Sequence, residues 1–314
     1  MELGWEPNMT KSSTKIGKLA GLLDGWLDGQ SGPDRLIGSK IREYTILECV
    51  GNGGMAKVYK ARHDLLDQLR ALKLLHPELS NEKSVKDRFR REARILSGLR
   101  CPHLVAVFEF GAFERGVLFM VMEYLEGESL MARLERAGRL SIHDAIAIAK
   151  QVAAGLAAVH ERGVIHRDIA PDNILLTPEA KREVVKIIDF GIAKDLIAGG
   201  TDSTHPLKFV GKSEYCAPEQ IARKEGQKLD GRSDVYSLGI TLYEMLAGAR
   251  PFKATGPACL GKHLAEPPAP FEKTNPEAEI PAALQDLVMR MLAKDRENRP
   301  PSMENLYMQL TAFE

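Results

Sequence analysis

Three oxygen-bearing side chains stand close together in the sequence. Asp168 and Asn173 belong to the segment His166-Arg167-Asp168-Ile169-Ala170-Pro171-Asp172-Asn173, and Asp189 opens Asp189-Phe190-Gly191. A carboxylate can accept a proton from a hydroxyl group, and carboxylate and amide oxygens are ligands for Mg²⁺. A lone His-Arg-Asp would occur by chance, whereas the whole segment followed by Asp-Phe-Gly 16 residues after Asn173 is a specific pattern. These residue types could therefore carry out proton transfer and metal binding, if the fold brings them together.

A glycine-rich turn lies upstream in the segment Tyr44–Leu75, which has the pattern of three strands. Small residues in such a turn let the backbone approach phosphate groups. A strand follows the turn, so it differs from a dinucleotide-binding fingerprint, where a helix follows. Taken alone, the motif is equally consistent with a plain hairpin. The turn consists of Gly51, Asn52, Gly53, Gly54, Met55 and Ala56.

A charged residue, Lys73, interrupts the apolar strand Arg70–Leu75. A lysine on the exposed face of a strand is the ordinary explanation. The glycine-rich turn just upstream favours a second explanation, in which both the turn and Lys73 contact phosphate groups. The two features together make a more specific pattern than either does alone.

The remaining patterns divide the chain into a strand-rich part and a helical part. A helix is predicted over Asn81–Leu99. Ser141, with Asp144 three residues on, has the pattern of a helix N-cap, and the long helix that follows ends at Gly163. Other predicted elements are the strands Val105–Phe110 and Val117–Glu123, the helices Ser233–Leu246, Leu284–Leu292 and Met303–Leu310, and a loop around one short helix at Lys253–Ile280.

In this order, the segments resemble those of eukaryotic-type (Hanks-type) protein kinases, and in particular the bacterial serine/threonine kinases. The resemblance extends over about residues 41–311. Besides the segments above, it rests on Val121-Met122-Glu123-Tyr124, Asp189-Phe190-Gly191-Ile192-Ala193-Lys194, Ala217-Pro218-Glu219, Ser233-Asp234-Val235-Tyr236-Ser237-Leu238-Gly239, and Arg299 within Asp295–Pro300.

The resemblance implies an α+β, two-lobed protein-kinase fold with ATP in the cleft. A five-stranded antiparallel sheet with one helix would form the N-lobe over residues 41–123, and a mainly helical C-lobe would cover residues 126–311. The kinase domain would span residues 38–314, after an extension over residues 1–37. Apolar residues recur at helical spacing in that extension, but several glycines interrupt them. It is either a partly ordered segment or an amphipathic helix that docks on the kinase or on a partner.

The implied reaction is transfer of the γ-phosphoryl group of ATP to a protein hydroxyl. Asp168 would accept the hydroxyl proton, while Asn173 and Asp189 would hold Mg²⁺, with Mn²⁺ as an alternative. Lys73 would contact the α- and β-phosphates and pair with an acid on the next helix. Glu92 fits the periodicity of that helix better than its other acidic residues do.

An adenine pocket is implied as well. Its hydrogen bonds would come from the backbone of Glu123 and Leu125. Its apolar wall would come from Val50, Val58, Ala71, Met122 and Leu175.

Two further matches concern positioning. Asp234 would brace the backbone of the catalytic loop, and Arg299 would pair with Glu219. Arg167 would gather a phosphate on the activation segment, ordering it through charge-assisted hydrogen bonds. The phosphorylation candidates are Thr201, Ser203 and Thr204, of which Thr204, seven residues before Gly211, is favoured.

The sequence departs from the family at three positions. Ala56 replaces the third glycine of the turn, Ala170 replaces a catalytic-loop lysine, and Lys212 replaces a threonine. One hypothesis is that Lys212 reaches back and supplies the missing positive charge near Asp168. The alternative is that Lys212 is solvated and the site is weaker.

Two rival functions remain, as does the choice between serine/threonine and tyrosine as acceptor. A pseudokinase or weakly active nucleotide-binding scaffold is favoured by the departures and disfavoured by the intact Lys73, Asp168, Asn173 and Asp189. A small-molecule kinase is disfavoured by Ala217-Pro218-Glu219, which belongs to a peptide-docking segment. Tyrosine specificity is disfavoured because Pro171-Asp172 follows Ala170 and no Lys-Trp signature is present near Tyr215.

Composition bounds the partners. The 314 residues carry 43 basic and 43 acidic side chains, so charge favours neither nucleic acid nor an anionic membrane as partner. The four cysteines are scattered, which is typical of a cytoplasmic protein. We expect no membrane segment, because no apolar run reaches about 18 residues. The chain is either cytoplasmic or the cytosolic domain of a longer, membrane-anchored protein. Its expected partners are protein substrates and, by resemblance, a second copy bound through the N-lobe.

Overall fold

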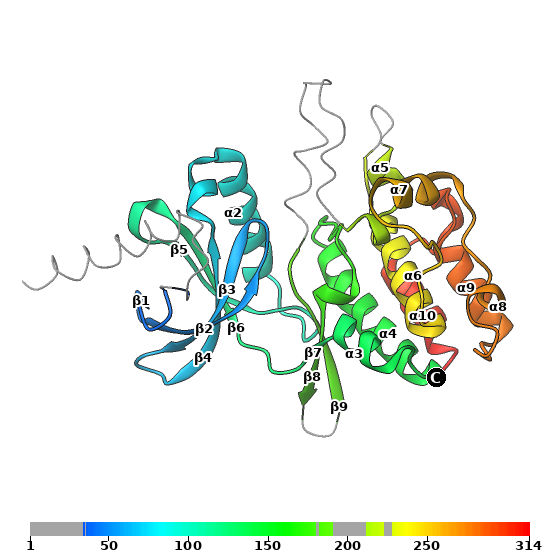
Figure 1. The fold of residues 1–314 in the computed structure, drawn as a ribbon, viewed down its shortest axis with the longest axis horizontal. Coiled ribbons are helices and arrows are strands. Elements are labelled where there is room, and N and C mark those ends of the chain that lie inside the picture. The colour runs from blue at the N-terminus through cyan, green and yellow to red at the C-terminus, as the bar shows by residue number, and fades with distance from the viewer. Residues whose placement is uncertain (1–33, 35, 180–181, 191–211, 223–227) are drawn as a thin grey trace, which may run out of the picture. The chain divides into compact units, whose positions relative to one another are not determined.

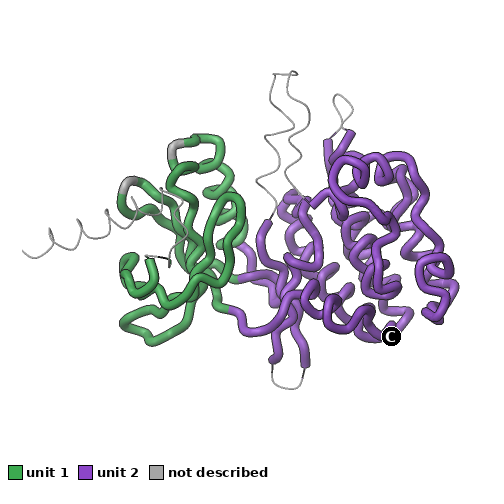
Figure 2. Tube along the Cα trace, in the orientation of Figure 1, with its two compact units in different colours: residues 1–97, 106–124 green, residues 98–105, 125–314 purple. Residues whose placement is uncertain are grey.

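The computed structural model describes residues 34, 36–179, 182–190, 212–222 and 228–314. Its contacts divide the described chain into two units (Figure 2). Unit 1 comprises the described residues up to Ser97 together with Ala106–Tyr124, and unit 2 comprises Gly98–Val105 and Leu125–Glu314. The short stretch 98–105 thus belongs to unit 2, although its neighbours on both sides belong to unit 1. The helix considered within residues 1–37 lies outside the described residues.

Unit 1 contains an antiparallel sheet of six strands in the order β1-β2-β3-β4-β6-β5 (Figure 1). The predicted number of five was wrong. The additional strand, β1, has two residues and pairs with the start of β2, and two residues are too few to show a strand periodicity. The strands are β1 Lys40–Ile41, β2 Tyr44–Asn52, β3 Ala56–His63, β4 Gln68–Leu75, β5 Val107–Ala112 and β6 Leu118–Glu123.

One helix, α2 (Lys83–Ser97), packs on this sheet. It begins two residues later than predicted, because Pro77–Asn81 form a 3-10 turn first. Side chains alternate between the two faces of a strand. Leu75 and Met120 therefore join Phe89 of α2 in a core on one face, while Leu72 and Leu74 point to the other.

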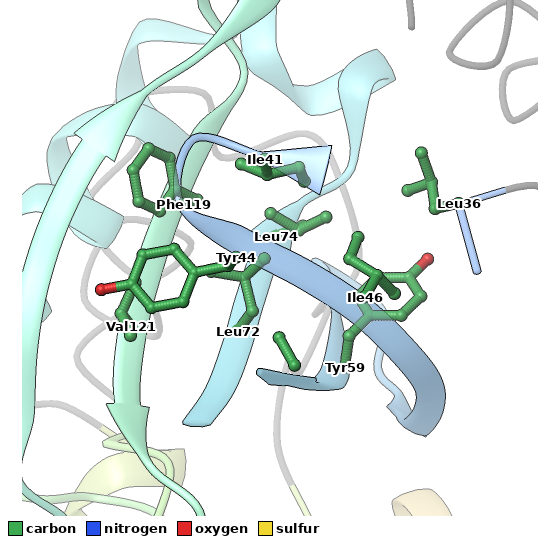
Figure 3. Packing of buried hydrophobic residues seen from close by; sticks show 10 residues of the cluster. Leu36, Ile41, Tyr44, Ile46, Tyr59, Leu72, Leu74, Phe119 and Val121 are labelled. Atoms are coloured by element: carbon green, nitrogen blue, oxygen red, sulfur yellow. The ribbon is translucent and has the colours of Figure 1, made fainter. Parts of the chain in front are cut away.

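The second face of the sheet is covered by the segment that precedes it. Leu36, which is fully buried, packs there with Ile41, Ile46 and Tyr59 (Figure 3). Asp34 fixes the start of this segment, because its Oδ2 accepts hydrogen bonds from Tyr59 Oη at 2.8 Å and from Lys57 Nζ at 3.2 Å. The chain is thus anchored from residue 34, before the predicted start of the kinase domain at residue 38.

Unit 2 is mainly helical, with a three-stranded sheet in the order β7-β8-β9. Helix α6 forms its centre, since 14 of its 16 residues are buried. The described helices are α3 Leu130–Ala137, α4 Ile142–His160, α5 Pro218–Ile221, α6 Arg232–Ala247, α7 Gly256–Ala265, α8 Phe271–Thr274, α9 Ala282–Met291 and α10 Met303–Thr311, and the strands are β7 Glu128–Ser129, β8 Ile174–Glu179 and β9 Arg182–Ile187.

The region Lys253–Ile280 contains two helices, α7 and α8, where one short helix was expected. Gly256 and Pro257 look like loop residues in the sequence, but they occupy the first turn of α7. Proline is well tolerated there, because the first-turn N–H groups have no partner within the helix.

Helix α4 is long and apolar enough to cross a membrane by length and composition alone, and no other helix among the described residues is. Its apolar side chains are accounted for by packing against α6, α10 and β9, with Ala149, Val152 and Leu156 fully buried. The predicted cap is confirmed, since Ser141 Oγ accepts a hydrogen bond from Asp144 N at 3.0 Å. In this structure α4 is a core helix.

Candidate active site

The catalytic-loop segment of unit 2 is held by one buried carboxylate. Asp234, which is fully buried in α6, accepts hydrogen bonds from His166 N at 2.8 Å and Arg167 N at 2.7 Å. Burial alone would raise the pKa of Asp234, but the hydrogen bond from His160 and the surrounding donors lower it below its usual value. The predicted brace is therefore present, and its carboxylate is ionised.

Two residues, one in this segment and one at the start of Asp189-Phe190-Gly191, adopt left-handed backbone conformations. Arg167 has a φ of 67° and Asp189 a φ of 60°. Such a conformation costs a non-glycine residue roughly 1–3 kcal/mol and persists only where the surroundings impose it. The hydrogen bond from Arg167 N to Asp234 is one such constraint.

The structure brings the backbones of Asp168, Asn173 and Asp189 together in unit 2. Asn173 Nδ2 donates to the carbonyl of Asp168 at 2.8 Å, and Ile188 N donates to the carbonyl of Asn173 at 2.9 Å. Because the Asn173 amide nitrogen is used inside the protein, its oxygen is the atom left to serve as a ligand. One amide oxygen and one carboxylate on adjoining segments form a donor set that suits Mg²⁺.

Unit 1 contains an ion pair between Lys73 and Glu92. Lys73 Nζ lies 2.8 Å from Glu92 Oε1, and both side chains are largely buried, at 12% and 7% exposure. The predicted partner of Lys73 is thus confirmed. A buried ion pair of this kind fixes where the ammonium group of Lys73 points.

The predicted adenine-wall residues are divided between the units. Val58 is paired with Lys73, and Ala71 with Met122, so these side chains share one face of the unit 1 sheet. Val50 is 48% exposed. Leu175 lies on β8 in unit 2.

The two residues expected to bond adenine through their backbone also lie in different units. Glu123 belongs to unit 1, where its N–H donates to the carbonyl of Ala106 and its side chain accepts from Ala106 N. Leu125 belongs to unit 2.

The glycine-rich turn has room for an approaching group. Gly53 N donates to the carbonyl of Ala56 at 3.0 Å, which closes the turn. A Cβ added at Gly54 would meet no atom within 4 Å, and one at Gly51 would make only ordinary contact with Val58. None of these glycines has a positive φ. The protein itself therefore does not require glycine at Gly51 or Gly54, as expected where a ligand needs the space.

Lys212 forms an ion pair with Asp172, which lies four residues after Asp168. Ala170, the other departure from the family, is fully buried. The phosphorylation candidates Thr201, Ser203 and Thr204 lie outside the described residues.

One positioning residue was missed by the sequence analysis. Gln220 accepts a hydrogen bond from Ala217 N at 3.1 Å and donates one to the carbonyl of Arg167, also at 3.1 Å. It thereby links the end of the activation segment to the catalytic loop. Its place directly after Ala217-Pro218-Glu219 was the available signal.

Two features define the protein-kinase class. The helical unit holds Asp168, Asn173 and Asp189 on a fixed catalytic loop, and the sheet unit contains the buried pair of Lys73 and Glu92. The chain belongs to the protein kinase family: the model of the protein kinase domain matches residues 44–310.

The relatives are bacterial. The chain is 39% identical over 289 residues to the serine/threonine-protein kinase pkn3 of Myxococcus xanthus, covering 90% of this chain and 52% of that protein. It is 34% identical over 282 residues to the serine/threonine-protein kinase PrkC of Bacillus subtilis, covering 89% and 42%. The chain thus spans about half the length of these curated relatives, or less.

Among solved structures, the kinase domain of Mycobacterium tuberculosis PknI is similar, with a TM-score of 0.68 and 27% identity. The match covers 88% of this chain and 99% of that one. The predicted two-lobed protein-kinase fold is confirmed by this likeness and by the family match.

Proposed function

We propose that this chain is a protein kinase that transfers the γ-phosphoryl group of ATP to serine and threonine hydroxyls of proteins. The observation that carries the proposal is the braced catalytic loop, in which Asp234 fixes the backbone and Asn173 bonds to Asp168. The similarity to serine/threonine-protein kinases such as pkn3 and PrkC supports the choice of acceptor.

Each polar residue has a role in this proposal. Asp168 accepts the hydroxyl proton while the hydroxyl oxygen bonds to the γ-phosphorus and the bond from that phosphorus to the ADP oxygen breaks. Lys73, oriented by Glu92, contacts the α- and β-phosphates. Asn173 and Asp189 would hold Mg²⁺ or Mn²⁺, which when bound neutralises phosphate charge. Most of the acceleration then comes from positioning and electrostatics.

The test of the proposal is transfer of radiolabel from γ-labelled ATP to a generic protein acceptor and to the chain itself. We expect labelling by the wild type and, because the proton acceptor is gone, almost none by Asp168→Asn. Binding of ATP without any labelling by the wild type would favour a nucleotide-binding scaffold. Labelling by Asp168→Asn at the wild-type rate would refute the assigned base.

Lys212 is proposed to replace the cation lost at Ala170. Its ion pair with Asp172 supports this, because it holds an ammonium group against the catalytic loop four residues from Asp168. We expect Lys212→Met to lower turnover by roughly tenfold to a hundredfold, since a cation that stabilises developing charge would be lost.

Two further variants separate relocation of the charge from simple weakening of the site. The double variant Ala170→Lys, Lys212→Thr should recover turnover, whereas Lys212→Thr alone should not. Because Ala170 is fully buried, a melting curve must show that the double variant is folded. Unchanged turnover in Lys212→Met would end this hypothesis.

We further propose that the chain phosphorylates its own activation segment, at Thr204 first, with Ser203 and Thr201 as alternatives. The support is Arg167, whose position next to Asp168 suits the collection of a phosphate. Intact mass and peptide mapping after incubation with ATP and Mg²⁺ should show added phosphate on the wild type and none on Asp168→Asn. An unmodified active wild type would contradict this.

A further inference from the structure

His76 makes two hydrogen bonds to the glycine-rich turn. Its backbone N donates to the carbonyl of Met55 at 2.9 Å, and its ring Nε2 lies 2.8 Å from the carbonyl oxygen of Gly53. A carbonyl oxygen can only accept, so Nε2 carries the hydrogen of this bond. One residue therefore binds two carbonyl groups of the turn, those of Gly53 and Met55.

These bonds also orient the amide groups of the turn. The carbonyl of Gly53 and the N–H of Gly54 belong to one planar peptide group, and in a trans peptide the two point in opposite directions. The same holds for the carbonyl of Met55 and the N–H of Ala56, since none of the described peptide bonds is cis. By binding the carbonyl of Gly53, the His76 ring keeps the N–H of Gly54 turned away from itself.

Backbone N–H groups that point outward from such a turn can donate hydrogen bonds to a phosphate. We propose that His76 is a positioning residue for the nucleotide phosphates, acting through the amide of Gly54. The inference rests on the proposed function, because the phosphates are those of ATP.

The surroundings of His76 make it a suitable holder. It follows directly after β4 and precedes the 3-10 turn Pro77–Asn81, and its own carbonyl accepts hydrogen bonds from Leu79 N at 3.0 Å and Ser80 Oγ at 3.3 Å. Lys73 lies three residues upstream on the same strand. The end of β4 thus carries both the phosphate-binding lysine and the residue that shapes the turn. A glycine-rich turn without such support would sample many conformations.

The test compares ligands with and without phosphates. Dissociation constants for ATP with Mg²⁺ and for adenosine are measured by calorimetry on the wild type, His76→Phe and His76→Gln. Phenylalanine keeps a flat ring but removes the donor, whereas glutamine keeps an N–H donor. Glu78→Gln, at an exposed residue of the 3-10 turn that follows His76, is the matched control.

We expect His76→Phe to weaken ATP binding by roughly fivefold to tenfold, the effect of losing about one hydrogen bond, and to leave adenosine binding unchanged. His76→Gln should recover most of the loss, and Glu78→Gln should behave as the wild type. In kinetics, KM for ATP should rise with little change in kcat.

Two results would overturn the inference. One is unchanged ATP affinity in His76→Phe, and the other is an equal loss of affinity for ATP and adenosine, which would indicate general loosening of unit 1. Absence of ATP binding by the wild type itself would instead count against the proposed function.

Discussion

The guanidinium of Arg299 donates two hydrogen bonds to the carboxylate of Glu219, from Nη1 to Oε1 at 2.7 Å and from Nη2 to Oε2 at 2.9 Å. Burial alone would raise the pKa of Glu219. The hydrogen bonds and charge of Arg299, with help from the Ser233 hydroxyl, lower it below its usual value. The pair joins α5, at the end of the activation segment, to the start of α6 and to the loop before α10, since Arg299 Nη1 also donates to the carbonyl of Arg232.

Removing one member of this pair should be costly. Arg299→Met would leave a carboxylate with 8% exposure and no partner of opposite charge. We expect a loss of roughly 3–5 kcal/mol in the free energy of unfolding, measured with urea. In the double variant Arg299→Met, Glu219→Gln the charge is gone, so part of the stability should return. A double variant less stable than Arg299→Met would show that the hydrogen bonds, and not the unpaired charge, dominate.

The ion pair between Lys73 and Glu92 should be essential for activity. Lys73→Met removes the cation from the phosphates, and we expect kcat/KM to fall by roughly 10²–10³. Glu92→Gln keeps an oxygen acceptor but loses the charge that orients Lys73, so its effect should be smaller, roughly tenfold. Steady-state kinetics provide the measurement. Lys40→Met, which removes a lysine with 61% exposure from the same unit, is the control. If it reduced activity as Lys73→Met does, the effect would not be specific.

The clamp made by Asp34 should stabilise unit 1. In Asp34→Ala the hydroxyl of Tyr59, a fully buried residue, would lose its acceptor, at a cost of roughly 1–3 kcal/mol in the free energy of unfolding. In a Tyr59→Phe background no hydroxyl is left without a partner, so Asp34→Ala should cost clearly less. Urea unfolding of the four proteins gives the coupling energy directly. A coupling near zero would mean that the hydrogen bond adds little.

Acid stability should depend on His263 in α7. Burial, and then the positive charge of Lys294, lower its pKa from the usual 6.5 to about 4. Between these two values the unfolded chain binds a proton that the folded chain does not, so the free energy of unfolding falls as the pH falls from 6.5 to 4. The slope contributed is at most about 1.4 kcal/mol per pH unit.

This slope can be isolated with one variant. In His263→Gln the contribution should be absent, so urea unfolding between pH 6.5 and 5 should show a flatter dependence than in the wild type. At about pH 8 and above the residue is neutral in both the folded and the unfolded state, so the difference between the two proteins should be constant there. Equal slopes below pH 6.5 would contradict the lowered pKa.

Local patterns in the sequence predict much of the fold. Ser141 and Asp144 mark the start of α4, because the hydrogen bond between them lies within one helical turn. Helix α2 was predicted to within two residues at each end, and the pairing of Lys73 with Glu92 follows from the face of that helix on which Glu92 lies. Helices α7 and α8 were harder to predict, since proline occurs both in the first turn of helices and in loops, and the sequence alone does not distinguish the two.

Other features depend on contacts between distant residues, which leave no local periodicity. Asp34 and Tyr59 are 25 positions apart in the sequence, and no pattern near either residue predicts their hydrogen bond. The same is true of Gln220, which donates to a carbonyl 53 positions away, and of His76 beside Gly53. Backbone carbonyls accept these last two bonds, and a backbone acceptor exists at every residue whatever its side chain.

The sequence by itself determined the family, the candidate chemistry and most of the helices and strands, because catalytic motifs and apolar periodicity depend only on the types and spacing of residues. Only the tertiary structure decided how the site is held: through which backbone atoms Asp234 binds the catalytic loop, that Lys212 pairs with Asp172, and that His76 binds the glycine-rich turn. Such contacts depend on distances of about 3 Å between backbone and side-chain atoms, and these are set when the chain packs.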